Sequence, residues 1–223
     1  ILNLDRSKMS KRLSATAIHE YRSSGYLPEA LVNFLSLLGW HPEGDREILN
    51  IEEITELFDL NRVQRGGAVF NLEKLDWLNS QYLKRLGSGE LFQKLKALGS
   101  IPEGFNSGQA MKIIELVRER MRRLNDFKDL ADFMFQVTDY PKELLVWKET
   151  PQHKILANLK EIIKVLKETK PQDFVKGKME EIITPLGDKL GRGEVFWPMR
   201  VALTGREASP GPLEIMEILG KKE

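Results

Sequence analysis

The 223-residue sequence contains no cysteine and only three histidines. Without cysteine there can be no disulfide, no zinc site with thiolate ligands and no thiol nucleophile, and a reducing compartment such as the cytoplasm is the expected location. The histidines, His19, His41 and His153, lie too far apart in the sequence to share one helical turn. A His-x-x-His pair for phosphate chemistry or metal binding is therefore excluded, and we expect no metal site.

The sequence also lacks an excess of charge and a long apolar run. Its 34 Lys and Arg and 33 Asp and Glu give a net charge of +1, so any surface for nucleic acid must come from local clustering. No run of about 18 apolar residues is present, and the first residues do not form a signal peptide. We expect a monomer with no membrane partner.

Apolar residues recur at helical spacing after the first dozen residues, which predicts a mainly α fold. The exception is a short extended segment at residues 1–5. Start and stop signals such as Pro28, Asn50 and Asn71 mark helix beginnings. The expected helices include residues 15–24, 90–98, 107–124, 127–137 and 213–219, and another with its apolar stripe at Ile155, Leu156, Leu159, Ile162, Ile163 and Leu166.

Glycine and proline steps predict three parts. The Gly87-Ser88-Gly89 step and the interruption at Tyr140-Pro141 suggest a small region at residues 1–87 and helical domains at 88–145 and 146–223.

The pentapeptide Lys8-Met9-Ser10-Lys11-Arg12 follows the extended segment. Two lysines three positions apart in a loop can place two ammonium groups on a triphosphate, where charge develops as pyrophosphate leaves. Taken alone, such a pentamer is more often a solvated turn. The chain begins with Ile within an apolar stretch, and we expect it to be part of a longer protein.

The sequence around this loop resembles bacterial-type glutamyl-tRNA synthetases, which are class I aminoacyl-tRNA synthetases. The similarity covers residues 19–40, 58–83 and 198–223, while residues 90–190 match in their sequence pattern more than in residue identity. The matching positions are Tyr21, Gly25, Tyr26, Leu27, Pro28, Glu29, Ala30, Asn33, Leu38, Gly39, Trp40, Phe58, Asp59, Phe70, Lys74, Leu75, Trp77, Leu78, Asn79 and Tyr82.

This resemblance implies an N-terminal stem-contact region and two α-helix cage domains that bind the anticodon. It also implies that the parent enzyme activates glutamate with ATP and Mg²⁺ and transfers it to tRNA(Glu), either alone or together with tRNA(Gln). Lys8, Ser10 and Lys11 match the loop that holds the ATP phosphates. The family's His-x-Gly-His motif is absent. No catalytic set is complete, and we expect tRNA binding without catalysis, with the catalytic domain of the parent chain as a partner.

The sequence departs from the family pattern at several positions. Met9 stands where leucine is frequent, and Arg12 replaces a serine. Gly66-Gly67 takes the place of a Ser-Pro pair, and Asn71 that of an aspartate. The last two changes put the detailed tRNA contact of that loop in doubt.

A cluster of arginines near residue 120 is the first candidate RNA contact. Arginines one helical turn apart can bind successive phosphates or a base edge in a loop. Glu115 and Glu119, within ion-pair reach, favour an ordinary solvated face. The resemblance instead implies that an arginine of this segment lies by the third anticodon base. The candidates are Arg118, Arg122 and Arg123, with Arg120, Lys112 and Lys128 nearby.

A second candidate lies near the C-terminus. The loop after Thr204 is rich in glycine and proline, which ordinary turn geometry explains for most of its residues. The resemblance implies a second anticodon-binding site formed by Arg200, Ser209, Pro210 and Leu213. Trp147 and Trp197 could stack on bases, but packing in the core is the more frequent role of such residues.

Two rival interpretations remain. A class I lysyl-tRNA synthetase shares the helix-cage architecture, and a helical scaffold that binds another protein would also suit many amphipathic helices with little net charge. Synthetases that read the anticodon with β-barrels are disfavoured, because residues 90–223 show no strand periodicity. Salt dependence separates an RNA-binding surface from an apolar groove.

Overall fold

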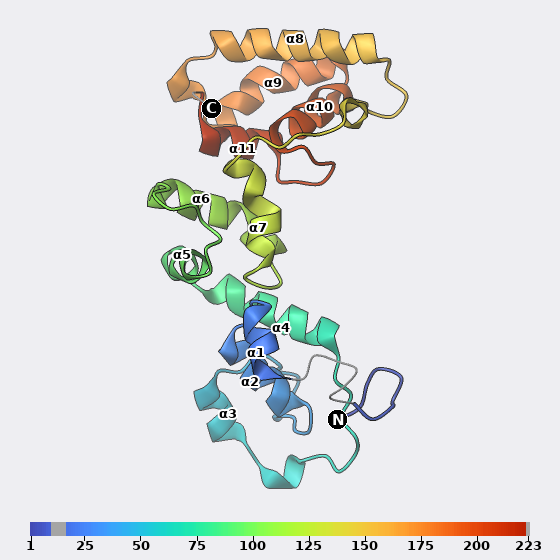
Figure 1. Ribbon diagram of the computed structural model, residues 1–223, viewed down its shortest axis with the longest axis vertical. Helices are drawn as coiled ribbons and strands as arrows, with labels where there is room; N and C mark the ends of the chain where they lie inside the picture. Colours follow the sequence, from blue (N-terminus) through green and yellow to red (C-terminus); the bar gives the residue numbers. More distant parts are fainter. Residues whose placement is uncertain (10–16, 222–223) are drawn as a thin grey trace. The chain divides into compact units, whose positions relative to one another are not determined.

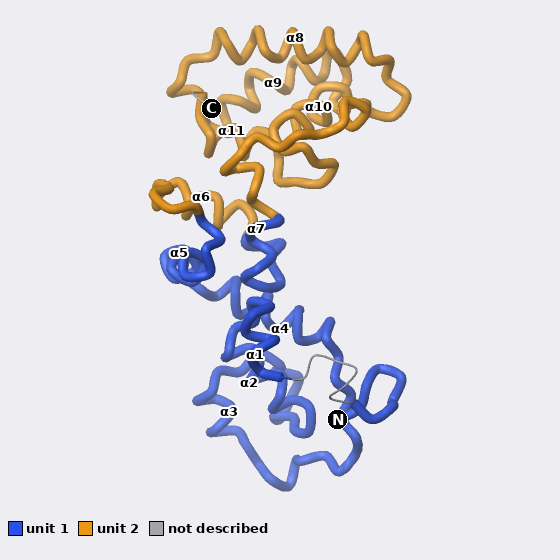
Figure 2. Tube along the Cα trace, viewed as in Figure 1, with its two compact units in different colours: residues 1–101, 118–129 blue, residues 102–117, 130–223 orange. Residues whose placement is uncertain are grey.

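The computed structural model of the protein describes residues 1–9 and 17–221 (Figure 1). Ser10, Lys11 and Arg12 of the lysine pentapeptide lie outside the described residues. The chain divides into two compact units (Figure 2): unit 1 is Ile1–Ile101 with Arg118–Asp129, and unit 2 is Pro102–Val117 with Leu130–Glu223. The division at residues 87 and 145 stays a prediction.

The extended N-terminus of unit 1 is shorter than expected. Leu2 forms two isolated bridges, antiparallel with Lys8 and parallel with Val69, and no longer ladder occurs in residues 1–9 and 17–221. The Leu2 N–H donates to the Ala68 carbonyl oxygen at 2.8 Å. The Asp5 carboxylate accepts hydrogen bonds from the N–H and hydroxyl of Ser7. These bonds turn the chain back within a few residues, so the strand predicted at residues 1–5 is reduced to single bridges.

Helices α1 (Ile18–Ser23) and α2 (Pro28–Leu37) follow. Gly25 ends the first at φ +87°, and a Cβ at this position would lie 2.7 Å from the backbone nitrogen of Asn125. Both the left-handed backbone and the close approach favour glycine. Pro28 occupies the first turn of α2, where its missing N–H has no helical partner to lose. The predicted helix start at Pro28 is confirmed. Of the helix predicted at residues 15–24, α1 covers Ile18–Ser23, and residues 15 and 16 lie outside the described residues.

Helices α3 (Ile51–Leu57) and α4 (Leu72–Arg85) begin at the predicted asparagines. Asn50 accepts from the Glu53 N–H at 2.8 Å, and Glu53 accepts from the Asn50 N–H at 2.9 Å. This reciprocal pair satisfies two amide groups at the helix start. Asn71 likewise accepts from the Lys74 N–H at 3.2 Å. A short 3₁₀ turn at Leu60–Arg62 separates the two helices, and α5 covers Ser88–Ala97.

The core of unit 1 forms where α2 packs against α4. Its buried residues come mainly from the stretch that carries the family resemblance: Tyr21, Tyr26, Phe34, Leu37, Leu75 and Leu78. A smaller cluster holds Trp40, Leu49 and Ile54.

The helix predicted at residues 107–124 ends earlier, at Val117. Helix α6 covers Ser107–Val117, a 3₁₀ turn follows at Arg118–Arg120, and α7 covers Asp126–Ala131. The Asp126 carboxylate accepts the N–H groups of Arg122 and Arg123 at 2.8 and 2.9 Å. Those N–H groups therefore bond to a carboxylate instead of continuing the backbone hydrogen bonds of α6. The expectation that the arginines share one helical face is wrong.

The helix predicted at residues 127–137 is also shorter. After α7 the chain forms a 3₁₀ turn at Asp132–Met134. Phe133 and Met134 are buried, but Val137 is 98% exposed. Burial of apolar side chains in this segment thus ends with the 3₁₀ turn.

In unit 2, α8 (Gln152–Glu168), α9 (Lys176–Leu190), α10 (Arg192–Thr204) and α11 (Pro212–Leu219) pack on one another, with short 3₁₀ turns at Lys142–Leu145 and Pro171–Asp173. Their core contains Ile162, Phe174, Met179, Ile183, Val195, Met199, Leu213 and Met216. Helix α10 was not predicted. The stripe on α8 is narrower than predicted, because Leu156 and Ile163 are 58% and 49% exposed.

Among residues 1–9 and 17–221, no helix has the length and apolar character needed to span a bilayer.

Candidate nucleic-acid interface

Lys8 is the one lysine of the pentapeptide that the structure describes. It lies in the returning arm of the N-terminal turn, where the following residue, Met9, donates its N–H to the Ile1 carbonyl oxygen at 3.2 Å. Its side chain is exposed and lines a hollow that is otherwise apolar. An ammonium group in this position is available to an anion. Its spacing to Lys11 and Ser10 is not described.

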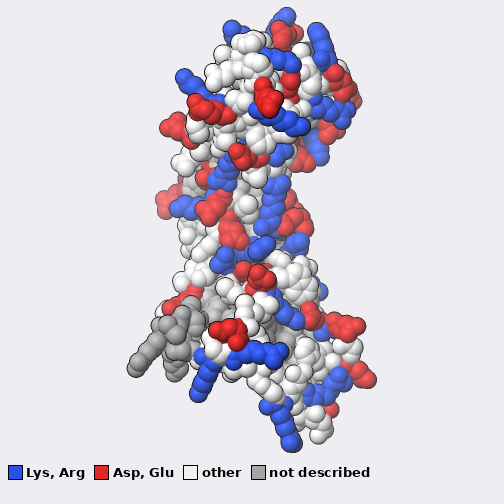
Figure 3. Space-filling model, turned by 90° about the vertical axis from the view of Figure 1, so that its right-hand side faces the viewer, with Lys and Arg blue, Asp and Glu red and all other residues white. Residues whose placement is uncertain are grey.

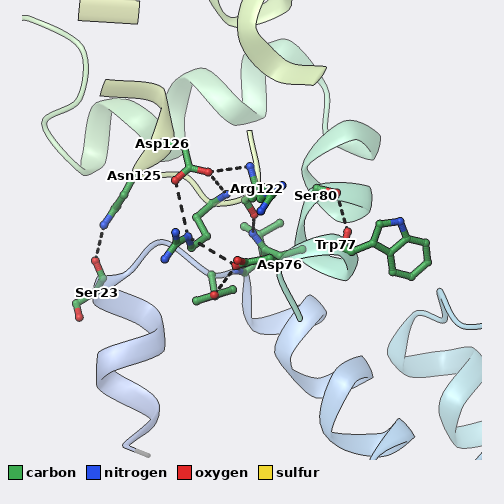
Figure 4. A network of polar contacts seen from close by, with 11 residues as sticks. Ser23, Asp76, Trp77, Ser80, Arg122, Asn125 and Asp126 are labelled. Carbon is green, nitrogen blue, oxygen red and sulfur yellow. Dashed lines mark hydrogen bonds and ion pairs between the residues drawn. The ribbon is translucent and has the colours of Figure 1, made fainter. Parts of the chain in front are cut away.

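Residues 118–125 are held against the α1–α2 connection and α4 by backbone contacts, all within unit 1. Asn79 on α4 donates its side-chain amide to the Arg122 carbonyl oxygen. The Leu124 N–H donates to the Gly25 carbonyl oxygen at 2.9 Å, and the Asn125 side chain donates to the Ser23 carbonyl oxygen at 2.7 Å. Figure 4 shows this network. The arginine segment is therefore a fixed loop rather than part of a free helix.

The side chain of Arg123 contacts charged and aromatic groups of unit 1. Its Nε lies 3.7 Å from Asp76 Oδ1 and 3.7 Å from Asp126 Oδ1, and its guanidinium centre lies 5.7 Å from the centroid of the Tyr26 ring. The Tyr26 hydroxyl in turn donates to Asp76. Burial, reinforced by this hydrogen bond, raises the pKa of Tyr26 above its ordinary value. The positive charge of Arg123 thus interacts with two carboxylates and the face of an aromatic ring.

Arg122 differs sharply from its neighbour. Its backbone is fixed at both the N–H and the carbonyl oxygen, whereas its side chain is exposed. No carboxylate of the described residues forms an ion pair with its guanidinium. Arg122 therefore presents a full positive charge from a well-fixed backbone position, which suits contact with a phosphate or a base edge.

Arg118 and Glu119 also take part in contacts within unit 1. Arg118 donates from Nη1 to the Leu86 carbonyl oxygen at 3.1 Å. Glu119 lies 2.8 Å from the Lys84 ammonium on α4. On the face shown in Figure 3, Lys and Arg lie among Asp and Glu.

The C-terminal candidates gather around the end of α10. Arg200 lies on the helix, and its Nη1 donates to the Ser209 carbonyl oxygen at 3.4 Å. The Ser209 hydroxyl donates to the Pro210 carbonyl oxygen at 2.8 Å. Ser209 and Leu213 are only 4% and 7% exposed, and Leu213 belongs to the unit 2 core. Arg200 is half-buried and is the candidate of this group with the largest polar side chain.

Sequence reasoning did not identify Arg206. Its guanidinium forms an ion pair with Asp132 and lies 5.6 Å from the centroid of the Phe133 ring. It is partly exposed in the same loop as Ser209. Asp132 is 74 positions away in the sequence, and no local motif signals such a pairing.

The two tryptophans pack on each other. The ring centroids of Trp147 and Trp197 are 5.1 Å apart, and the Trp197 indole N–H donates to the Leu144 carbonyl oxygen at 2.8 Å. Both are half-buried. This arrangement favours a packing role.

Comparison with protein families places these features in a class. A family model described as an anticodon binding domain matches residues 76–223, and one described as the catalytic domain of class I tRNA synthetases (E and Q) matches residues 1–77. The chain belongs to the family of synthetase anticodon-binding domains.

The individual relatives are glutamate–tRNA ligases. Glutamate–tRNA ligase 2 of Thermoanaerobacter pseudethanolicus is 38% identical over 229 residues, covering 100% of this chain and 47% of that protein. The glutamate–tRNA ligase of Moorella thermoacetica is 38% identical over 232 residues, with the same coverage. The chain spans about half the length of the relatives it matches.

Solved structures agree with the sequence relatives. A glutamate–tRNA ligase from Elizabethkingia meningosepticum, solved in complex with its amino acid, superposes with a TM-score of 0.83 at 30% identity. It covers 100% of this chain and 48% of the other. A glutamate–tRNA synthetase from Elizabethkingia anophelis gives a TM-score of 0.76 at 29% identity over 97% of this chain. The family resemblance and the mainly α fold are confirmed, and the lysyl alternative is not favoured.

Proposed function

We propose that this chain is the tRNA-binding part of a glutamate–tRNA ligase, which attaches glutamate to tRNA with ATP. The match of residues 76–223 to an anticodon binding domain carries the proposal. The expected RNA is tRNA(Glu), either alone or together with tRNA(Gln). ATP is the proposed substrate of the parent enzyme, with Mg²⁺, and Lys8, Ser10 and Lys11 are the proposed contacts to its phosphates. A cytoplasmic monomer remains the expected form.

For the anticodon we propose two groups of contacts. Among Arg118, Arg122 and Arg123, we favour Arg122, because its guanidinium is exposed while that of Arg123 is held by two carboxylates. In unit 2, Arg200 would supply the charged contact. Ser209, Pro210 and Leu213 are mostly buried, so they would act through backbone groups and through the shape of the loop.

Binding of tRNA at two salt concentrations tests the proposal. A surface that neutralises about four phosphates loses about a hundredfold in affinity for a fourfold rise in salt. The chain should bind purified tRNA(Glu) at low salt and release it steeply as salt rises. No binding at low salt would overturn the proposal, and binding that is indifferent to salt would favour the protein-interaction scaffold instead.

A further inference from the structure

A polar hollow of about 380 Å³ lies beside α4 in unit 1. Its lining comes from residues 45–48, from Glu53 on α3, and from Trp77 and Arg85 on α4. Trp77 and Arg85 are about two helical turns apart, so their side chains project from the same side of the helix. We call this surface the Trp77 hollow.

Trp77 gives the hollow an exposed aromatic face. The residue is 43% exposed, and its indole points away from the polar network around Arg122 (Figure 4). Within residues 1–9 and 17–221, neither a second aromatic ring nor a cation lies over this indole. It differs in this respect from Trp147 and Trp197, whose rings pack on each other. An open indole beside a hollow suits stacking against a flat aromatic ligand.

Two ion pairs neutralise most of the charge around the hollow. Arg46 Nη2 lies 2.5 Å from Glu53 Oε1, and Lys74 Nζ lies 2.5 Å from Glu47 Oε1. These pairs fix the walls of the hollow and leave no net charge of their own. The groups available to a ligand are therefore the remaining charged residues of the lining.

Asp45 and Arg85 are those remaining residues. Both are exposed, and neither side chain forms an ion pair in the part of the chain that the structure describes. A carboxylate accepts hydrogen bonds at two oxygens and can bind two adjacent N–H groups. A guanidinium donates in a fork that matches a phosphate. A ligand that matches the hollow carries an aromatic ring, two adjacent donors and an anionic group.

We infer that the Trp77 hollow binds a guanosine monophosphate unit, with the base stacked on Trp77, the base edge at Asp45 and the phosphate at Arg85. The Watson–Crick edge of guanine presents N1–H and N2–H side by side, and one carboxylate can accept both. Adenine, cytosine and uracil each place a single donor group there beside acceptors. The unit could come from an unpaired guanine of RNA or from a free guanine nucleotide. Only the RNA source rests on the proposed function.

NMR titration of the isotope-labelled chain with 5′-GMP tests the inference, because the four tryptophans give separate indole N–H resonances. Trp77→Phe identifies the resonance of Trp77. This resonance should shift and saturate with a dissociation constant of about 1 mM or tighter, while those of Trp40, Trp147 and Trp197 stay in place. AMP should bind about tenfold more weakly, because adenine cannot satisfy both oxygens of the carboxylate.

Two substitutions separate the base contact from the phosphate contact. Asp45→Asn should weaken GMP binding about tenfold and leave AMP binding unchanged, because the amide has only one acceptor oxygen. Arg85→Gln should weaken GMP binding about tenfold and leave guanosine binding unchanged, because guanosine has no phosphate. Asp139→Asn and Arg65→Gln, at exposed residues outside the lining of the hollow, should bind GMP as the native chain does. Equal binding of GMP and AMP, or equal losses of both in Asp45→Asn, would overturn the inference.

A short single-stranded RNA distinguishes the two sources. A response of the Trp77 resonance to UUGUU but not to UUAUU would assign the site to RNA, and a response to GMP alone would assign it to a free nucleotide. No response to GMP or to UUGUU would overturn the inference. The experiment that tests the proposed function uses intact tRNA(Glu) and its salt dependence, so the two can fail independently.

Discussion

The side-chain amide of Asn79 on α4 donates a hydrogen bond to the carbonyl oxygen of Arg122, which lies 43 positions later in the segment between α6 and α7. The same Asn79 side chain accepts the Leu27 N–H at 2.8 Å. One buried amide thus fixes both the start of α2 and the arginine segment.

Asn79→Ala should lower the free energy of unfolding by about 2–4 kcal/mol, because it leaves the buried N–H of Leu27 and the partly buried carbonyl of Arg122 without partners. Asn61→Ala is the control, since Asn61 is exposed and bonds only to nearby Asp59, and it should cost less than about 0.5 kcal/mol. Urea unfolding followed by circular dichroism measures both. Equal losses would show that Asn79 has no special structural role.

The Tyr82 hydroxyl lies 2.5 Å from the Leu49 carbonyl oxygen and 2.9 Å from Asn33 Oδ1. Burial raises the pKa of Tyr82 to about 12, from an ordinary value of 10.0. Between these values the unfolded chain has released the phenolic proton while the folded chain retains it. Stability contributed by this group is therefore complete below pH 10.0 and is lost as the pH rises toward about 12.

Accordingly, the native protein should lose up to about 1.4 kcal/mol per pH unit more than Tyr82→Phe across this range. The native protein and Tyr82→Phe share every other ionisable group, so the difference isolates Tyr82. Tyr140→Phe, at a half-buried tyrosine, is the control and should follow the native curve. Parallel slopes for the native protein and Tyr82→Phe would refute the prediction.

Arg122 and Arg123 should separate tRNA binding from stability. Arg122→Glu should weaken tRNA(Glu) binding by about tenfold or more at low salt and reduce the salt slope by about 1–2, with little change in unfolding, because its side chain is exposed. Arg123→Ala should instead lower stability by about 1–3 kcal/mol, since it leaves Asp76 and Asp126 without their shared cation.

Lys164→Glu is the matched charge reversal for this experiment, because Lys164 is exposed on α8. It should change tRNA binding less than Arg122→Glu does. Equal losses for the two reversals would mean that only the total charge matters and that Arg122 makes no specific contact.

On α8, the neighbours Ile162 and Ile163 differ in exposure, at 2% and 49%. Ile162→Ala should destabilise the protein by about 2–4 kcal/mol, as removal of a buried aliphatic side chain leaves a cavity. Ile163→Ala should cost less than about 1 kcal/mol, and denaturant midpoints measure both. A similar loss at the two positions would contradict the narrow buried stripe.

The apolar stripe read from the sequence predicts that both isoleucines are buried, and only Ile162 is. Apolar spacing identifies a helix and its general inner face, but neighbouring elements decide how wide the buried strip is. Helix α10 was missed for a related reason. Gly193 and Pro198 weaken its local helix propensity, while tertiary packing buries Val195 and Met199 and stabilises the helix.

The candidate site was predictable only in part. The capping asparagines and the lysine pentapeptide are local signals and can be read from adjacent residues. The contrast between Arg122 and Arg123 depends on Asp76, which is far away in the sequence. Asp126 is close in the sequence, but its carboxylate accepts the N–H groups of Arg122 and Arg123. Whether these N–H groups bond to the carboxylate or continue α6 depends on the folded structure and cannot be read from the local sequence.

Two glycines at the second position of a helix should respond oppositely to alanine. At Gly193 of α10, a Cβ would overlap the indole of Trp147, whereas at Gly177 of α9 it would meet open space. Gly193→Ala should therefore destabilise the protein by about 1–3 kcal/mol and shift its tryptophan emission, because the indole has to move. Gly177→Ala should stabilise it by about 0.4–1 kcal/mol through the helix propensity of alanine and lower entropy of the unfolded chain. Urea unfolding and fluorescence spectra measure both, and a neutral Gly193→Ala with unchanged emission would show that Trp147 does not pack closely on α10.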